Sequence, residues 1–295
     1  MFIRRHPYLF FVLLATSVVC VAVLGTVSLI VFAIGGGERL DGERVGVIEI
    51  TDLISDAKET LQSLKRFRED PSIRAIVLRI DSPGGAVGPS QEIYTEVVRT
   101  VKTKKIVASF GSVAASGGYY AAAGADGIVA NPGTITGSIG VILGFANFEE
   151  LMNKIGLVPV VIKSGEYKDV GSPVRAMTAE ERAFLEDFAR KIHRQFIRDV
   201  AAGRKTDIEG VAAVADGRIL TGEEAVSLGL VDRLGNLEDA IEWAGRMGGI
   251  EGKIRTVYAE SETLHLLKYL SGSSVSALFK RMLLPGLSAD AVYRP

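Results

Sequence analysis

The sequence of 295 residues has only one cysteine and three histidines. One cysteine excludes an internal disulfide framework and a cysteine-rich zinc site, and so few histidines argue against a histidine-rich metal centre. An excess of either charge is also missing, because 34 Lys and Arg residues stand against 35 Asp and Glu residues. This balance argues against a general nucleic-acid binder, which needs a basic surface for phosphates. Hydrophobic residues make up 47% of the chain, enough for a folded core, which excludes a disordered protein.

Charge is absent altogether from residues 8–34, a run of 27 residues. About 20 apolar residues span the hydrocarbon core of a membrane, whereas the apolar region of a cleaved signal peptide has about 7–15. We therefore predict an uncleaved transmembrane signal anchor over this run, with a cleaved signal peptide as the alternative. Arg4 and Arg5 precede the run, so the positive-inside rule predicts that residues 1–7 lie in the cytoplasm.

After the anchor, the sequence predicts a short linker over residues 35–44 and a folded domain over residues 45–258, outside the cytoplasm. Runs rich in β-branched residues alternate there with amphipathic stretches, a pattern typical of parallel β-α-β units. Thr178 and Glu181 form the signature of a capping box at the start of the longest helix. The expected strands are 45–50, 74–80, 105–110, 127–130, 139–143, 158–162 and 254–258, and the expected helices are 55–68, 90–101, 116–124, 148–155, 178–202, 223–227 and 237–246.

The C-terminal tail, residues 259–295, carries apolar residues at helical spacing in LHLLKYL and VSALFKRMLL. Such spacing predicts a helix that docks against the core or a neighbouring subunit. An amphipathic segment that lies on the membrane surface is the alternative.

Two glycine-rich turns each follow a predicted strand: DSPGGA at 81–86 and SVAASGGYY at 112–120. In parallel sheets, sites form at the carboxyl ends of strands, and glycine lets backbone N–H groups approach a ligand closely. Two such turns side by side can supply two converging N–H donors, which is the geometry of an oxyanion hole. Ser116, at a helix start and beside the Gly117 N–H, is then a candidate nucleophile.

Glycine-rich turns also occur where no nucleophile is present. Both segments can be ordinary strand-to-helix connections, with Ser116 only a helix N-cap. A phosphate cradle is disfavoured, because neither segment matches G-x-x-x-x-G-K-S/T or G-x-G-x-x-G. The stretch around Ser116 is not a G-x-S-x-G nucleophile elbow either.

A serine nucleophile needs a base, and the three histidines are poorly placed for that role. His6 precedes the anchor, His193 lies in a strongly charged helical stretch where we expect it to be solvated or salt-bridged, and His265 lies in the tail. A neutral lysine is the alternative, because burial favours the uncharged amine. Lys163 and Lys168 both follow a predicted strand, and their positions alone do not choose between them.

Four motifs together resemble the signal peptide peptidase A (SppA) family, the bacterial membrane-anchored Ser/Lys proteases. They are DSPGG (81–85), SVAASGGYY (112–120), TGSIGV (136–141) and KSGEYKDVGSP (163–173). Any one of them is weakly specific, but the four in this order and spacing are strongly specific. The resemblance extends from about residue 45 to residue 231 and includes the anchor.

The resemblance implies a set of site residues. The catalytic residues would be the nucleophile Ser116, the base Lys168, which precedes the Ser-Pro pair, and Ser138, which orients the base. The oxyanion hole would be formed by the N–H of Gly117 with that of Gly84 or Gly85. No metal or organic cofactor is required. Glu166 and Asp169 flank the lysine and would disfavour its neutral form if they faced inward, so we expect both to face solvent.

The same resemblance implies a fold, an assembly and a location. The fold would be an α/β spiral of β-β-α units, shared with the caseinolytic (ClpP) proteases and the crotonases. The chains would form a homo-oligomeric ring or dome in the bacterial inner membrane, with the catalytic domain on the periplasmic side. The substrates would be signal peptide remnants and other apolar peptides.

Two functions from other classes stay open at this stage. A crotonase-type acyl-CoA enzyme would share the fold and the oxyanion hole, but it would need carboxylates as acid and base and a basic site for the CoA phosphates. A non-catalytic anchored scaffold is the other alternative, and the presence of both Ser116 and Lys168 argues against it.

Overall fold

The computed structural model describes Tyr8, residues 16–19, 21 and 25, and residues 43–259. The chain divides into two compact units, Met1–Gly42 and Glu43–Pro295. Most of the predicted anchor and linker, and all of the predicted tail after Ala259, lie outside the described residues. Among the residues that are described, no helix combines the length and the hydrophobicity that a membrane crossing needs.

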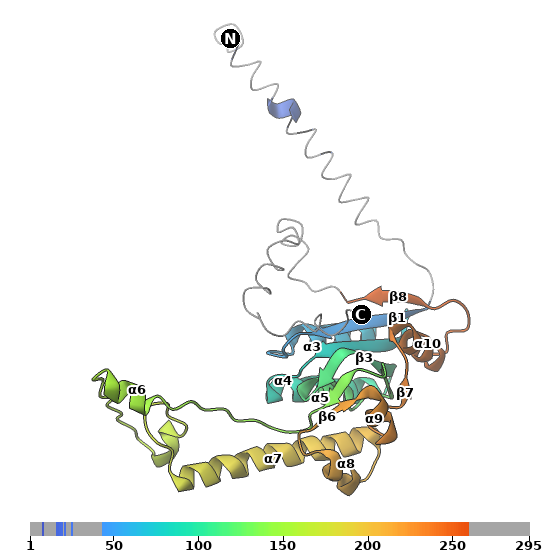
Figure 1. The fold of residues 1–295 in the computed structure, drawn as a ribbon. Helices are drawn as coiled ribbons and strands as arrows, with labels where there is room; N and C mark the ends of the chain where they lie inside the picture. Colours follow the sequence, from blue (N-terminus) through green and yellow to red (C-terminus); the bar gives the residue numbers. More distant parts are fainter. Residues whose placement is uncertain (1–7, 9–15, 20, 22–24, 26–42, 260–295) are drawn as a thin grey trace, which may run out of the picture. The chain divides into compact units, whose positions relative to one another are not determined.

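The second unit is an α/β structure in which one sheet is flanked by helices (Figure 1). Its strands are β1 (Arg44–Thr51), β2 (Ile73–Ser82), β3 (Lys105–Ala115), β4 (Gly127–Ala130), β5 (Ile135–Gly137), β6 (Ile219–Thr221), β7 (Arg233–Leu234) and β8 (Arg255–Tyr258). Its helices are α3 (Lys58–Glu69), α4 (Val87–Thr100), α5 (Gly117–Ala122), α6 (Glu149–Lys154), the 3-10 turn η1 (Glu166–Asp169), α7 (Ala179–Arg204), α8 (Ile208–Val214), α9 (Gly222–Ser227) and α10 (Leu237–Met247).

The strands run in the order β6-β5-β3-β2-β1-β8, and β4 pairs with both β3 and β7. All of these pairs are parallel except β5 with β6. The predicted alternation of strands and helices in parallel units is therefore confirmed for the centre of the sheet. The structure adds α8, β5, β6 and β7, whose short segments carry too few residues for a clear periodicity.

The central strands β1, β2 and β3 are buried on both faces, which explains their nearly continuous apolar runs. Alternate residues point to opposite faces of the sheet. Ile76 and Leu78 of β2 pack into the cluster that also holds residues of α3, α4 and α5. Ala75 and Val77 of the same strand pack against α10 on the other face.

Strand β3 is longer than the sequence predicted and pairs with two different strands on the same side. Its first half pairs with β4, and its second half, Val113–Ala115, pairs with β5. The sequence predicted that this strand ends at residue 110 and that a glycine-rich turn follows from residue 112, but the strand continues to Ala115, and Asp81 Oδ1 accepts the Val113 N–H at 3.0 Å. This extension carries the chain five residues further before it reaches Ser116.

The expected strands at 139–143 and 158–162 are not formed. Both segments are rich in Ile, Val and Leu, but neither pairs with a strand among the described residues, and Ile162 is 96% exposed. Strand propensity needs a neighbour to pack against, so these predictions are wrong for the single chain. Residues 141–178, here called the arm, instead run out toward the N-terminal end of α7 and carry α6 and η1 (Figure 1).

Helix α7 is the longest described helix and begins where the sequence predicted. The Thr178 side chain accepts the Glu181 N–H, and the Glu181 side chain accepts the Thr178 N–H, so the predicted capping box is confirmed. Only the C-terminal half of the helix packs on the core, through residues that include Phe196 and Val200. The N-terminal half projects away with the arm.

Candidate active site

Ser116 lies between the last residue of β3 and the first residue of α5, in a backbone conformation with φ +50° and ψ −120°. A positive φ is sterically unfavourable for a residue with a Cβ and costs about 1–3 kcal/mol. The surrounding chain enforces it, because the Ser116 N–H donates to Gly137 O at 2.9 Å and the Tyr120 N–H donates to Ser116 O at 2.9 Å. The hydroxyl caps no helical N–H, so the alternative of a simple N-cap is not supported.

The glycines of the two turns meet at this serine. A Cβ placed on Gly84 would lie 2.6 Å from the Gly117 nitrogen and 2.9 Å from the Ser116 Cβ, so only glycine allows the turns to approach this closely. Gly84 also has φ +103°, a conformation that glycine adopts readily. The structure therefore brings Gly84, Gly85 and Gly117 together around Ser116, as the two motifs suggested.

Hydrogen bonding distinguishes between the two glycines of the first turn. The Gly84 N–H already donates to Ser82 Oγ at 3.1 Å. The Gly85 N–H has no acceptor among residues 43–259. The Gly117 N–H belongs to the first residue of α5, where a helix offers no internal acceptor. Gly85 and Gly117 are thus the pair with free donors.

A backbone hydrogen bond joins the segment that contains Ser138 to Ser116. Its neighbour Gly137 accepts the Ser116 N–H and pairs with Ala115 across β3 and β5. Ser138 also has φ +50°, and its N–H donates to Arg218 O at 2.8 Å. Its half-buried hydroxyl makes no hydrogen bond with any described residue, so it is free to contact a further polar group.

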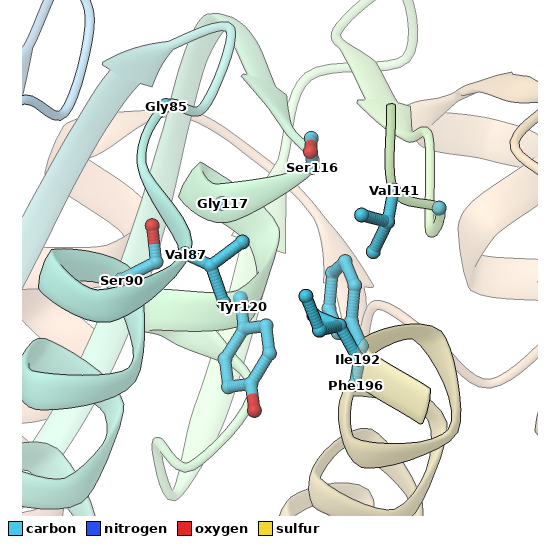
Figure 2. A pocket seen from close by; sticks show the side chains of 10 residues that line it. Gly85, Val87, Ser90, Ser116, Gly117, Tyr120, Val141, Ile192 and Phe196 are labelled. Carbon is cyan, nitrogen blue, oxygen red and sulfur yellow. The ribbon is translucent and has the colours of Figure 1, made fainter. Parts of the chain in front are cut away.

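A pocket opens beside Ser116, with about 280 Å³ of space when its mouth is included. Figure 2 shows apolar side chains around it, from α4, α5, α7 and the start of the arm. They belong to Val87, Tyr120, Val141, Ile192 and Phe196. Because the walls are mainly apolar, the pocket suits an apolar side chain beside the reacting group.

Tyr120 joins this pocket to α7 through a polar network that the sequence analysis missed. Its ring stacks on Phe196 with the centroids 4.4 Å apart. Its hydroxyl donates a short hydrogen bond to Asp199 and accepts one from Gln91 Nε2 at 3.2 Å. Burial, followed by the hydrogen bond with Asp199, raises the pKa of Tyr120 well above its ordinary value. No periodicity marks such a pair, since Tyr120 and Asp199 are 79 residues apart.

His193 makes no salt bridge with a described residue, and its ring contacts the backbone instead. Its ring nitrogen Nε2 lies 3.2 Å from Ile139 O, and the side chain is half-buried. This contact ties α7 to the TGSIGV segment that contains Ser138.

The two candidate lysines have different surroundings in the arm. Lys163 Nζ donates to Glu166 O at 2.8 Å and pairs with Asp169 Oδ1 at 2.7 Å. The Lys168 ammonium has no hydrogen bond or ion pair with a described residue, and the side chain is exposed. A base needs a free amine, so this difference favours Lys168 over Lys163.

Within a single chain, Lys168 does not lie at the pocket. The turn η1 that carries it packs on the N-terminal half of α7, where the rings of Tyr167 and Phe184 are 5.1 Å apart. The pocket contacts α7 at Ile192, and eight residues of helix correspond to about 12 Å. Lys168 is not among the residues that line the pocket.

The carboxylate beside Lys168 does not face solvent as expected. Asp169 is only 15% exposed and is held by Arg175 Nε at 2.9 Å as well as by Lys163. The hydrogen bonds from Arg175 and then Lys163 hold the pKa of Asp169 well below its usual range. Glu166, by contrast, is exposed.

A constrained serine beside two free N–H donors supports acyl transfer through a serine ester. By class, then, the molecule is a serine hydrolase. Residues 99–250 match Peptidase family S49, and residues 43–135 match the Clp protease family. The chain therefore belongs to peptidase family S49, as the four motifs predicted, and is a serine-type protease.

Individual relatives agree with this assignment. The chain is 47% identical over 211 residues to a putative protease of Synechocystis sp., covering 71% of this chain and 76% of the relative. It is 31% identical over 287 residues to a putative protease of Methanocaldococcus jannaschii, covering 90% and 92%. It is 40% identical over 183 residues to a putative signal peptide peptidase SppA of Enterococcus faecium, covering 62% and 53%.

A solved structure shares the fold. A mutant of the 1510-N membrane-bound stomatin-specific protease superposes with a TM-score of 0.51 at 17% identity, covering 76% of this chain and 100% of that one. Together with the Clp protease match, this likeness confirms the predicted Clp protease-like α/β fold at the level of the sheet and its helices.

Proposed function

We propose that this protein is a membrane-anchored serine endopeptidase in which Ser116 and Lys168 form the catalytic dyad. The observation that carries the proposal is the constrained Ser116 beside the free N–H groups of Gly117 and Gly85. Membership of a peptidase family argues against the acyl-CoA enzyme and the scaffold.

The proposed reaction uses these groups in order. Neutral Lys168 accepts the hydroxyl proton as Ser116 Oγ attacks the peptide carbonyl carbon. The carbonyl oxygen becomes negative and accepts hydrogen bonds from Gly117 and Gly85. Lys168 gives the proton to the leaving amine, and water then hydrolyses the ester with the same lysine as base. The free hydroxyl of Ser138 orients the amine.

The base in each site comes, in this proposal, from a neighbouring copy of the chain. The turn that carries Lys168 packs on α7 at Phe184, which lies about 12 Å along the helix from the pocket residue Ile192. The arm also exposes large apolar side chains that a neighbour would cover, among them Phe145, Phe148, Leu151, Ile155 and Val160. Head-to-tail contacts of this kind close into rings, which fits the expected ring or dome of β-β-α spirals.

The substrate and the location are parts of the same proposal. The pocket walls formed by Val87, Ile192 and Phe196 suit peptides with apolar side chains, such as signal peptide remnants. The uncharged run at residues 8–34 would anchor the protein in the inner membrane with its catalytic domain on the periplasmic side.

The test is complementation between two inactive variants of the full-length protein in detergent micelles. Ser116→Ala and Lys168→Ala should each abolish cleavage of a fluorogenic apolar peptide. An equal mixture, co-assembled during expression, should recover about one quarter of wild-type activity, because that share of interfaces joins an intact serine to an intact lysine. Lys154→Ala, another exposed lysine of the arm, is the matched control and should keep full activity.

Each outcome has a distinct meaning. An inactive mixture of properly assembled chains would show that each chain supplies its own base. A Lys168→Ala protein with wild-type activity would refute the dyad itself.

A further inference from the structure

Arg175 lies at the centre of a charged cluster between η1 and α7. Its Nε donates to Asp169 Oδ2 at 2.9 Å, and its Nη2 donates to Asp169 O at 3.2 Å. Its Nη1 donates to Glu181 Oε2 at 2.8 Å, and its Nη2 also donates to Glu181 Oε1. Nη1 further donates to Ala176 O at 3.0 Å. One guanidinium therefore joins the turn that carries Lys168 to the first turn of the helix.

The cluster is fixed at its helical end. Glu181 is 7% exposed at its side chain, and it also accepts the Thr178 N–H in the capping box. The planar fork of arginine matches two carboxylates at once, which a lysine cannot do. Because Glu181 cannot move without breaking the helix cap, Arg175 holds η1 in one position relative to α7.

The cluster also neutralises Asp169, the carboxylate next to Lys168 in the sequence. Arg175 takes one oxygen of Asp169, and Lys163 takes the other at 2.7 Å. The charged groups around this turn are Glu166 and Asp169 on η1, Lys163 and Arg175 on its flanks, and Glu180 and Glu181 on α7. Without the arginine, Lys163 would be the only one of these cations left to balance the four carboxylates, and their excess charge would favour a protonated lysine at position 168.

We infer that Arg175 is the positioning residue for the proposed base: it fixes the turn that presents Lys168 and keeps Asp169 from pairing with that lysine. The inference rests on the proposed function, since it assigns Arg175 a role only if Lys168 is the base. The hydrogen bonds that Arg175 donates to Glu181 and then to Asp169 raise the pKa of Arg175, so the guanidinium stays charged at every pH of interest.

The test measures kcat and KM against pH for the full-length protein in micelles, with an apolar peptide substrate. Arg175→Gln should move the pH midpoint of kcat upward by about one unit, since a bare carboxylate near an amine stabilises its charged form. It should change KM less than kcat. Arg175→Lys keeps a positive charge beside Asp169 but loses the two-carboxylate fork, so its pH midpoint should lie near the wild-type value. Asp169→Asn added to Arg175→Gln should return the midpoint to the wild-type value.

Two controls separate positioning from folding. Arg190→Ala removes an arginine of α7 whose ion pairs are exposed, and it should leave the midpoint unchanged. The single variant Asp169→Asn keeps Arg175, so it tests the inference even if the Arg175→Gln protein does not assemble. It should lower the midpoint, by up to about one unit, because Arg175 and Lys163 then lose the carboxylate that neutralises them and nearby positive charge favours a neutral amine.

Three results would overturn the inference. One is a wild-type pH profile in Arg175→Gln, and another is a shifted profile that Asp169→Asn does not reverse. The third is a rise of the midpoint in Asp169→Asn alone. If Lys168→Ala is inactive in the same assay, these results refute the role of Arg175 and leave the dyad standing. An active Lys168→Ala protein refutes the dyad instead.

Discussion

The backbone of Ser116 allows a test that separates strain from chemistry. Ser116→Ala and Ser116→Gly both remove the hydroxyl, so both should be inactive, and they differ only by a Cβ. At φ +50° and ψ −120° that Cβ is strained, and its removal should release about 1–3 kcal/mol. Glycine makes the unfolded chain more flexible, which offsets about 0.4–1 kcal/mol of this gain. We expect Ser116→Gly to be more stable than Ser116→Ala by about 0.5–2 kcal/mol.

The measurement is thermal unfolding of the two full-length variants in detergent, at one scan rate and one protein concentration. In a domain of this size, 1 kcal/mol corresponds to about 2–4 °C in Tm, so the glycine variant should melt about 1–8 °C higher. Ala183→Gly in the exposed N-terminal half of α7 is the matched control and should lower stability by about 1 kcal/mol. A Ser116→Gly protein that melts at or below Ser116→Ala would refute the claim that the fold holds this residue under strain.

Two further predictions concern α7. Tyr120→Phe should lower the free energy of unfolding by about 1–2 kcal/mol, because Asp199 and Gln91 lose their shared hydrogen-bond partner. The control Tyr258→Phe, at the exposed end of β8, should change the free energy of unfolding little. Equal losses of stability in the two variants would contradict the network. The hydrogen bonds from Arg175 and the Thr178 N–H lower the pKa of Glu181 from 4.5 to about 2, so the stability it contributes is complete above pH 4.5 and is lost as the pH falls toward 2. The rate at which pepsin cleaves the arm in the Ser116→Ala background, divided by its rate on an unfolded substrate at the same pH, should therefore rise across that range. A ratio that is the same at pH 4.5 and pH 2.5 would contradict the assignment.

Much of the central fold could be predicted from local patterns. The strands β1, β2 and β4 appear as short apolar runs because both faces of the sheet are covered, and α7 begins at a capping box. The segments 139–143 and 158–162 have the same composition as true strands, yet they stay unpaired. Their fate depends on what lies beside them, which composition does not encode.

The candidate site divides in the same way. The glycine turns and Ser116 could be identified because a close approach of two backbones requires glycine at particular positions. The choice of Gly85 over Gly84 as a donor depends on one hydrogen bond to Ser82. The family resemblance already implied Lys168 rather than Lys163, and the ion pair between Lys163 and Asp169 favours the same choice. Such contacts exist only once the chain has folded.

The sequence by itself determined the family and the alternation of strands and helices, and it pointed to Ser116 as the proposed nucleophile, because each depends on residue types at short spacing. Only the tertiary structure decided that β3 extends to Ala115, that Tyr120 bonds to Asp199 and that Arg175 joins η1 to α7. It also decided how far Lys168 lies from the pocket of its own chain, because the length of α7 between Phe184 and Ile192 sets that separation. These features join residues that are distant in sequence or depend on packing in three dimensions, and no local pattern constrains them.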